Sequence, residues 1–205
     1  MKTWMAMALW VAGLLAAPAW AQDGLDAIGE RIAQVPVLRG EFRQEKRVTG
    51  FKQPLRSQGA FLLARDQGVI WTTTRPFPSE VVLTRDRILS RQADGSTRVE
   101  LDGRQQPALR AVNETMFALM TGDTRALSER FDVQAEAVGA QDWRLTLTPR
   151  SGTLARAFKR IALQGGRHVR QVELEEASGD RTLLEFSALR ETPAELSDDE
   201  AGRFD

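Results

Sequence analysis

Beyond residue 37 most of the pattern predicts β-strands, from enrichment in Val, Ile, Thr and aromatic residues in 58–89 and from strict alternation of apolar and polar positions in segments of the last third. In residues 143–148, for example, Trp143, Leu145 and Leu147 occupy every second position. Such a strand has one apolar and one solvated face, which is typical of antiparallel sheets. The strands expected from this pattern begin near residue 38 and then cover 58–65, 69–74, 81–89, 99–101, 131–137, 143–148, 157–163, 169–176 and 181–189.

A segment before the strands has helical spacing instead. Residues 23–35 carry apolar side chains three or four positions apart, at Leu25, Ile28, Ile32 and Val35. This spacing predicts an amphipathic helix, and Pro36 is expected to end it. The apolar face is small, so the helix has to lie against something larger.

A second helix is expected in the middle of the chain, where the alternation stops. Residues 108–121 place five apolar side chains on one helical stripe, and Gly122 ends the segment. These side chains are Leu109, Val112, Met116, Phe117 and Met120. A short helix over 124–129 is expected to follow.

The whole pattern predicts a mainly β, α+β fold with one large antiparallel sheet of roughly nine to eleven strands. A sheet of that length curls, and the helical segments fit across the open mouth of the curl. We expect a single domain over residues 22–205. The tail 193–205 is acidic and poor in apolar residues, so we expect it to be loosely held.

The N-terminus has the features of a cleavable secretory signal. Lys2 precedes the uncharged apolar run 5–17, and Ala19 and Ala21 form a small-x-small cleavage site. The alternative is an uncleaved anchor helix, but the run is shorter than the roughly 20 residues that span a bilayer. We therefore expect cleavage after Ala21 and a soluble mature protein of about 184 residues.

Composition narrows the function classes further. Removal of residues 1–21 leaves 27 Lys and Arg against 28 Asp and Glu, which disfavours nucleic acid as a partner. The chain has no cysteine, so neither disulfides nor thiol catalysis is available. His168 is the only histidine, so a two-histidine metal site cannot form, and we expect His168 at the surface rather than as a general base. No cofactor or metal is expected.

Motifs for catalysis or nucleotide binding are missing from the sequence. Acidic residues are plentiful, but nothing singles out a glycosidase-type carboxylate pair. What remains is apolar surface inside a curled sheet, which either fills a core or lines a cavity for an apolar ligand. Periodicity alone favours the core. Arg65, at a strand end, is either a solvated charge or a donor to the carbonyls of a lid.

The order of these segments resembles the periplasmic outer-membrane lipoprotein carrier family, LolA, up to about residue 190. The matching stretches are Leu-Arg-Gly-Glu-Phe-Arg-Gln at 38–44 and Gly-Ala-Phe-Leu-Leu-Ala-Arg at 59–65. Val-Ile-Trp at 69–71 and Pro76 follow at the family's spacing.

The resemblance implies a half-open barrel closed by a helical lid, with a hydrophobic cavity that shelters acyl chains. By position, Arg65 matches the arginine that locks the closed lid, and Val69 and Trp71 match residues that face the cavity. The full set of expected cavity-lining residues is Phe42, Phe61, Leu63, Val69, Trp71, Met116, Phe117, Met120, Leu145 and Leu147.

The implied role is a monomeric, non-enzymatic periplasmic carrier that takes lipoproteins from an inner-membrane exporter to an outer-membrane receptor. Two departures from the family bear on this role. Asp66 stands where the family has proline after the arginine, and the family's C-terminal extension is expected to be missing, which would affect handover to the receptor. Alternatives are a shuttle for a non-lipoprotein acylated or polyene lipid with a dedicated exporter, a lipid-sensing envelope regulator, and an enzyme acting on lipid.

Overall fold

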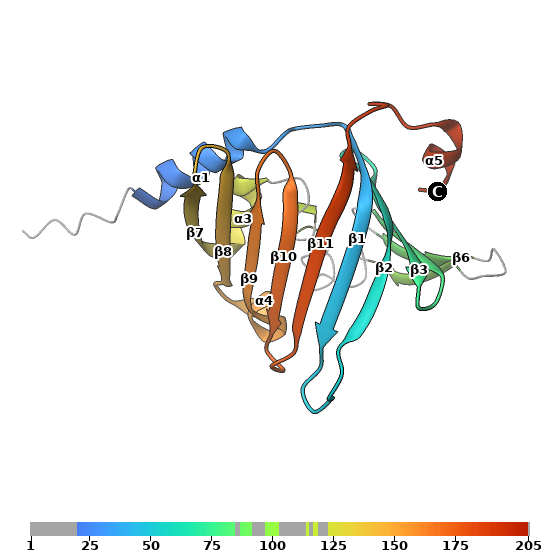
Figure 1. Cartoon of the computed structure of the whole chain (residues 1–205), viewed down its shortest axis with the longest axis horizontal. Coiled ribbons are helices and arrows are strands. Elements are labelled where there is room, and N and C mark those ends of the chain that lie inside the picture. The colour runs from blue at the N-terminus through green and yellow to red at the C-terminus, as the bar shows by residue number, and fades with distance from the viewer. Residues whose placement is uncertain are drawn as a thin grey trace, which may run out of the picture.

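The computed structural model describes residues 20–84, 87–91, 97–102, 114, 117, 118 and 123–204. Eleven strands form one curved sheet, and the helices lie against its two faces (Figure 1). The strands are β1 (Val37–Arg47), β2 (Leu55–Ala64), β3 (Gly68–Arg75), β4 (Ser79–Thr84), β5 (Arg87–Arg91), β6 (Thr97–Asp102), β7 (Phe131–Val138), β8 (Asp142–Pro149), β9 (Phe158–Gly165), β10 (Val169–Glu176) and β11 (Arg181–Arg190).

All the strand pairs are antiparallel, in the order β6-β5-β4-β3-β2-β1-β11-β10-β9-β8-β7. The first and last strands in the sequence are therefore neighbours at the centre of the sheet, where Phe42 is paired with Phe186. The ends of the sheet, β6 and β7, are not paired with each other, so the barrel stays open. The predicted fold class, a curled antiparallel half-open barrel, is confirmed.

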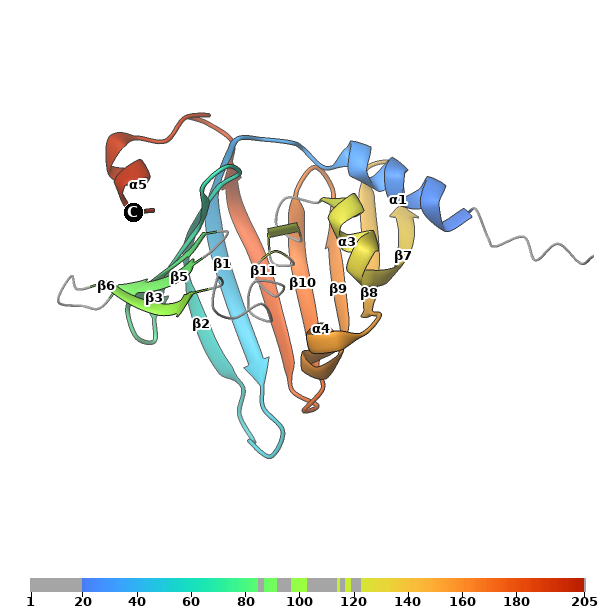
Figure 2. The same cartoon turned by 180° about the vertical axis from the view of Figure 1, so that it is seen from behind.

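The first helix, α1 (Trp20–Arg31), lies on the concave face beside α3 (Thr124–Arg130) (Figure 2). Its apolar residues Leu25 and Ile28, and Ile32 directly after it, are buried in one core cluster with residues of β8 and β9. Burial of this one apolar stripe holds the helix to the sheet.

The first helix ends four residues earlier than the sequence pattern predicts. Instead of continuing to residue 35, the backbone bonds to distant segments: Ala33 N donates to the carbonyl of Arg167 at 2.8 Å, and the carbonyl of Pro36 accepts from Arg65 N at 2.9 Å. The proline also disfavours helical geometry at the residue before it. The α1–β1 linker is therefore fixed by tertiary hydrogen bonds.

Two further boundaries differ from the prediction. The single strand expected at 81–89 is a hairpin of two strands, β4 and β5, in which Val82 is paired with Leu89. The strand expected from residue 157 begins at Phe158, after a short helix α4 (Gly152–Ala157). Within 81–89 the polar stretch 84–87 separates the apolar residues of the two strands, so the change of direction coincides with the break in the apolar residues.

The C-terminal segment is ordered against the convex face, and the expectation that it is loose is wrong. It contains α5 (Asp198–Gly202), whose N-terminus has a capping box between Ser197 and Glu200. The ring of Phe204 is only 6% exposed and packs in one cluster with the convex-side residues of β1 to β5, among them Ile70 and Val82. The first half of the sheet is thus apolar on both faces.

Among the residues that the structure describes, no helix combines the length and the apolar character needed to span a membrane.

Candidate apolar binding cavity

The concave face holds an apolar cavity of about 360 Å³ between the two halves of the sheet. Its volume lies within the range of roughly 300–1,000 Å³ that is usual for small-molecule sites. The cavity is lined by Gln44, Lys46, Val69, Trp71, Val81, Leu83, Val169, Val172, Leu174, Thr182, Leu184 and Phe186.

Alternation along the strands produces this lining. On β3, Val69 and Trp71 point to the concave side, while Ile70 packs on the convex side against the C-terminal segment. The antiparallel register places Val81 beside Trp71 and Leu83 beside Val69. Because side chains on one face of neighbouring strands lie side by side, four apolar residues form a continuous wall.

An aromatic cluster supports the indole of Trp71. The ring centroid of Phe42 lies 3.9 Å from that of Trp71, and the ring of Phe186 meets Trp71 edge-on at 6.1 Å. Phe61 completes the cluster, with its ring 5.3 Å from that of Phe186. Edge-to-face and offset aromatic pairs stabilise beyond their buried area, so Trp71 is a fixed part of the cavity wall.

One end of the cavity is polar. Lys46 lines it, and its Nζ lies 2.6 Å from Glu176 Oε1 and 3.9 Å from Asp180 Oδ2. Thr182 is paired with Lys46 across the β1–β11 ladder. The ion pair gives the apolar cavity a charged lip at the end where β1 and β10 finish.

The predicted lining residues lie in different places. Val69 and Trp71 line the cavity. Phe42 and Phe61 do not line the cavity but contact the ring of Trp71. Phe42 belongs to the core cluster that contains α1, and Leu63 belongs to the same cluster as Phe61.

The remaining predicted residues lie apart from these. Phe117 is partly buried and packs against the cluster of Phe61 and Val69. Leu145 and Leu147 are fully buried in the cluster that contains α1, and they are not among the residues that line the cavity. Met116 and Met120 lie outside the described residues.

Sequence reasoning did not assign several residues that line the cavity. Val81 and Leu83 lie in a predicted strand, as do Val172, Leu174 and Leu184. Their signal is the apolar and β-branched content that marks the strands in general. It predicts the strands but not which of their side chains face an open space.

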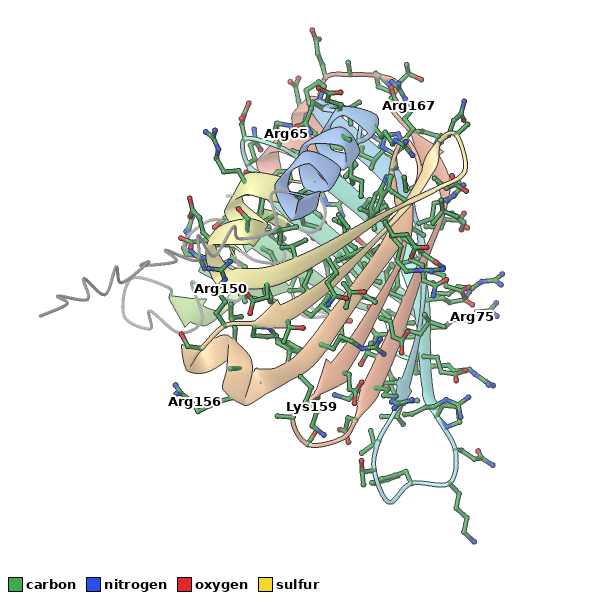
Figure 3. The ribbon with its side chains drawn as sticks, turned by 90° about the vertical axis from the view of Figure 1, so that its left-hand side faces the viewer. Arg65, Arg75, Arg150, Arg156, Lys159 and Arg167 are labelled. Carbon is green, nitrogen blue, oxygen red and sulfur yellow. The ribbon has the colours of Figure 1, made fainter. Side chains whose placement is uncertain are left out.

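Arg65 lies at the end of the sheet where α1 joins β1 (Figure 3). Its Nε donates to the carbonyl of Val35 at 3.3 Å, and its side chain is partly buried. Among the described residues, the arginine therefore binds the α1–β1 linker. Whether it also bonds to the middle segment that was expected as a lid lies outside the described residues.

His168 is only 12% exposed, which corrects the expectation of a surface residue. Its Nε2 lies 2.8 Å from Glu191 Oε1, and the guanidinium of Arg167 contacts both oxygens of the same carboxylate, at 2.6 and 2.9 Å. Hydrogen bonds from Arg167, and then from His168, lower the pKa of Glu191 to about 2. The cluster ties the β9–β10 turn to the end of β11. Within the described part of the chain, no group of three His, Cys, Asp or Glu could hold a metal.

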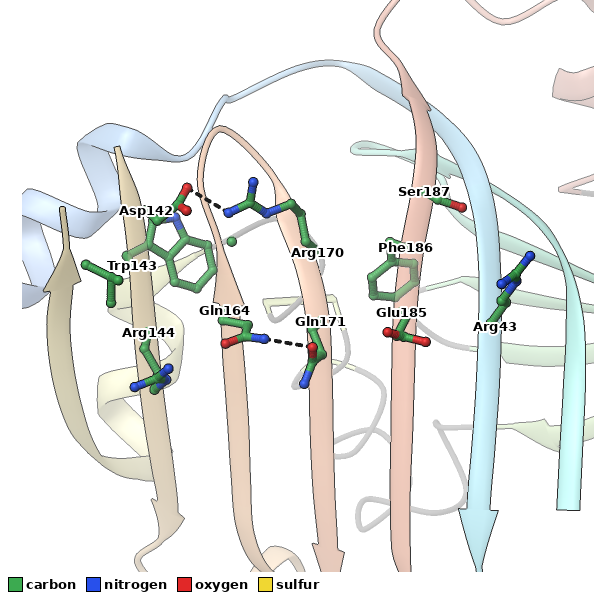
Figure 4. A pocket seen from close by; sticks show the side chains of 12 residues that line it. Arg43, Asp142, Trp143, Arg144, Gln164, Arg170, Gln171, Glu185, Phe186 and Ser187 are labelled. Atoms are coloured by element: carbon green, nitrogen blue, oxygen red, sulfur yellow. Dashed lines mark hydrogen bonds and ion pairs between the residues drawn. The ribbon is translucent and has the colours of Figure 1, made fainter. Parts of the chain in front are cut away.

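A second hollow, of about 640 Å³, lies on the convex face across β8 to β11 and β1 (Figure 4). Its side chains are largely polar and bond to one another: Gln164 Nε2 donates to Gln171 Oε1 at 2.7 Å, and Arg170 pairs with Asp142 at 2.7 Å. An apolar ligand would gain little there, because it would displace water from polar groups. The concave cavity is therefore the candidate site.

An open, curved antiparallel sheet with an apolar cavity on its concave face defines a class of fold that can enclose an apolar ligand. The model of the family described as outer membrane lipoprotein carrier protein LolA matches residues 33–200. The chain belongs to this family, and the resemblance seen in the sequence is confirmed.

Individual relatives agree with the family match. An outer-membrane lipoprotein carrier protein of Cupriavidus pinatubonensis is 29% identical over 199 residues, which cover 92% of this chain and 85% of the relative. A protein of the same name from Dechloromonas aromatica is 25% identical over 176 residues, 83% of this chain and 78% of the relative. The crystal structure of a DUF1329 family protein from Desulfovibrio piger covers 87% of this chain and 95% of its own at 15% identity, with a TM-score of 0.51, and so shares the fold.

Proposed function

We propose that this protein is a periplasmic carrier that shelters the acyl chains of lipoproteins in its concave cavity. The observation that carries the proposal is the apolar wall of Val69, Trp71, Val81 and Leu83, which lines a cavity on the concave face. Membership in a family of lipoprotein carriers supports it. The carrier acts without catalysis and exchanges its cargo with an inner-membrane exporter and an outer-membrane receptor.

The physics of acyl chains explains why such a cavity is useful. Exposure of a lipid chain to water costs about 0.8 kcal/mol per CH₂, so a chain crosses an aqueous compartment only if its methylenes are covered. A sheet that is not closed can admit and release a chain without breaking strand pairs. The open edge between β6 and β7 is therefore compatible with a shuttle.

Export to the periplasm relies on the proposed signal over residues 1–21. Helix α1 begins at Trp20, so cleavage after Ala21 would remove only its first two residues. The buried side chains Leu25, Ile28 and Ile32 would all remain. The mature chain would therefore keep the contacts that hold α1 to the sheet.

A fluorescent fatty acid tests the cavity directly. We expect Trp71→Glu, which places a charge in the apolar wall, and Val81→Trp, which fills the space without a charge, each to weaken binding by at least about tenfold. Val138→Glu is the matched control, because Val138 is 40% exposed and outside the concave cavity. Wild-type affinity in a folded Val81→Trp variant would refute the assignment of the cavity.

Mass spectrometry of lipid that co-purifies with the protein identifies the cargo. The cavity contacts an acyl chain through apolar side chains, so it does not by itself distinguish lipoproteins from other acylated lipids. Acylated peptides would support the lipoprotein role. A polyene or another non-lipoprotein lipid would instead assign the protein to a dedicated lipid exporter.

A further inference from the structure

Exposed apolar side chains are concentrated on two loops at one end of the sheet. Phe51, in the β1–β2 loop, is 70% exposed, and Phe77, in the β3–β4 turn, is 80% exposed. Leu55, where β2 begins, is 57% exposed. Burial of a phenylalanine side chain is favourable, so exposed rings at loop tips indicate a surface that is covered in use.

The structure holds these rings outward. Phe51 N donates to the carbonyl of Val48 at 3.0 Å, and Gly50 between them adopts a positive φ of 90°, so a tight turn presents the ring. The loop is tied to the β10–β11 turn, where Asp180 Oδ1 accepts from Thr49 N at 2.9 Å. Phe77 stands between Pro76 and Pro78, whose rings restrict the backbone around it.

Basic residues lie near the exposed rings, although Lys46, Arg47 and Arg56 are each paired with a glutamate. Residues 45–56 contain four basic residues and one acidic residue. Lys52 and Arg75 form no ion pair with any described residue, and Arg75 points outward from the sheet on the side away from the helices (Figure 3). At the opposite end of the strands, residues 191–204 contain five acidic residues and one basic residue. These two segments therefore carry opposite net charge, although the net charge of the chain is zero.

The same end gives access to the cavity. Leu55 is paired with Lys46 across the β1–β2 ladder, and Lys46 lines the polar lip of the cavity. Paired residues of neighbouring strands lie on one face. The exposed Leu55 therefore lies on the concave side between the β1–β2 loop and the cavity, and the loop forms the lowest point of the molecule in Figure 1.

We propose that this end of the sheet docks on the surface of an anionic lipid bilayer. Phe51 and Phe77 enter the headgroup region, while Lys52 and Arg75 pair with lipid phosphates. Aromatic rings beside basic residues are the side chains that favour such an interface. Each ring stands on its own loop tip, so a fluid bilayer can accept both independently, whereas a protein partner would need a separate pocket for each.

Flotation with lipid vesicles tests the docking. We expect the wild-type protein to bind vesicles of equimolar phosphatidylcholine and phosphatidylglycerol more tightly than vesicles of phosphatidylcholine alone. The Phe51→Ser/Phe77→Ser double variant should bind the anionic vesicles at least about tenfold more weakly. Val138→Ser, which changes an exposed apolar residue elsewhere, is the matched control and should bind as the wild type does.

A charge series tests the other half of the proposal. Lys52→Gln/Arg75→Gln should lose binding to anionic vesicles and should reduce its sensitivity to salt, because screened charges attract anionic lipid less. Arg125→Gln, an exposed arginine on α3, is the control. Failure of the wild type to float, equal binding to both vesicle types, or full binding by either double variant would overturn the proposal.

Docking is independent of the proposed carrier function, and the two can fail separately. The Phe51→Ser/Phe77→Ser variant should bind the fluorescent fatty acid with wild-type affinity, because neither ring lines the cavity. Loss of vesicle binding with intact fatty-acid binding supports docking. Intact vesicle binding by a cavity variant such as Val81→Trp shows that the surface acts without the cavity.

Discussion

Gly59 lies where the backbones of β2 and β3 approach most closely. The register of the two strands shifts between Gln58 and Gly59. A Cβ at position 59 would lie 1.9 Å from the carbonyl oxygen of Thr72, a contact that neither strand can relieve by rotating a side chain. Glycine is therefore required here by the sheet itself, next to the strand that carries Trp71.

We predict that Gly59→Ala lowers the free energy of unfolding by about 1–3 kcal/mol, since the extra methyl forces the strands apart. Urea denaturation of the purified variant measures the change. Gly202→Ala is the control, because a Cβ at Gly202 would meet no atom within 4 Å. Equal stability of Gly59→Ala and the wild type would mean that the sheet absorbs the methyl without strain.

Arg65 acts on the linker between α1 and the sheet through its hydrogen bond to the carbonyl of Val35. We predict that Arg65→Leu leaves the circular dichroism spectrum unchanged but alters the rate at which a fluorescent fatty acid is released. The rate is measured by displacement in a stopped-flow instrument, with Arg125→Leu as the control. Identical release rates for Arg65→Leu and the wild type would contradict a locking role.

At the level of elements, one arginine fastens the C-terminal segment to the sheet. Arg39 of β1 donates through Nε and Nη2 to the two oxygens of Glu200, each at 2.7 Å. Its other bonds are to the carbonyls of Pro193 and Glu195. The fork of a guanidinium suits this bidentate arrangement, so Arg39 holds both α5 and the chain that leads to it.

We predict that Glu200→Gln lowers the free energy of unfolding by about 1–3 kcal/mol at pH 7, because the pair with Arg39 is charged and partly buried. The hydrogen bonds from Arg39 lower the pKa of Glu200 from 4.5 to about 2. A depressed folded-state pKa stabilises the protein above the unfolded pKa, and this contribution is lost as the pH falls from 4.5 towards 2.

The difference in stability between the wild type and Glu200→Gln should therefore shrink over that acidic range. Urea titrations at pH 7 and pH 3 measure it. Glu195→Gln serves as the control, since Glu195 contributes only its backbone carbonyl to Arg39. A difference that is the same at both pH values would rule out the linkage to Glu200.

Strands of the second half of the sheet were predictable because each buries one face, and burial of one face leaves a period of two in the sequence. Trp143, Leu145 and Leu147 of β8 show it, and all are buried. The C-terminal segment leaves no such period. Its contacts rest on Leu196 and Phe204, set in an acidic stretch, and on Arg39, which is 161 residues away from Glu200. A contact between residues so far apart in the sequence can be recognised only when the fold of the sheet, and so the position of β1 beside the C-terminal segment, is known.

Periodicity could not separate the cavity from the core. Val69 and Leu145 occupy the same kind of inward position on their strands, and both are 1% exposed. Leu145 packs under α1, whereas Val69 borders the cavity. The difference depends on where the helices settle on the concave face, which is decided by tertiary packing and not by the strands themselves.

At the scale of the whole molecule, the proposed N-terminal signal gives a prediction about the mature chain. We predict that the exported protein begins at Gln22, because the small side chains of Ala19 and Ala21 fit a signal peptidase. Intact-mass measurement of protein from a periplasmic extract locates the cut. Ala21→Leu should block processing, whereas Ala17→Leu, outside the cleavage site, should not. Recovery of the full-length chain from the wild type would favour the uncleaved anchor.

The pairing of β1 with β11 also governs when the sheet can form. Arg39 pairs with Arg190, so the central ladder closes a loop that contains all the remaining described strands, β2 to β10. Closing so long a loop is slow, and the strands on either side can pair earlier through local hairpins. The two halves of the sheet therefore cannot join until β11 is available, and in a chain exported N-terminus first, as proposed, β11 would cross late. Under the proposed export, the two halves of the sheet would therefore remain unjoined until nearly the whole chain has crossed the membrane.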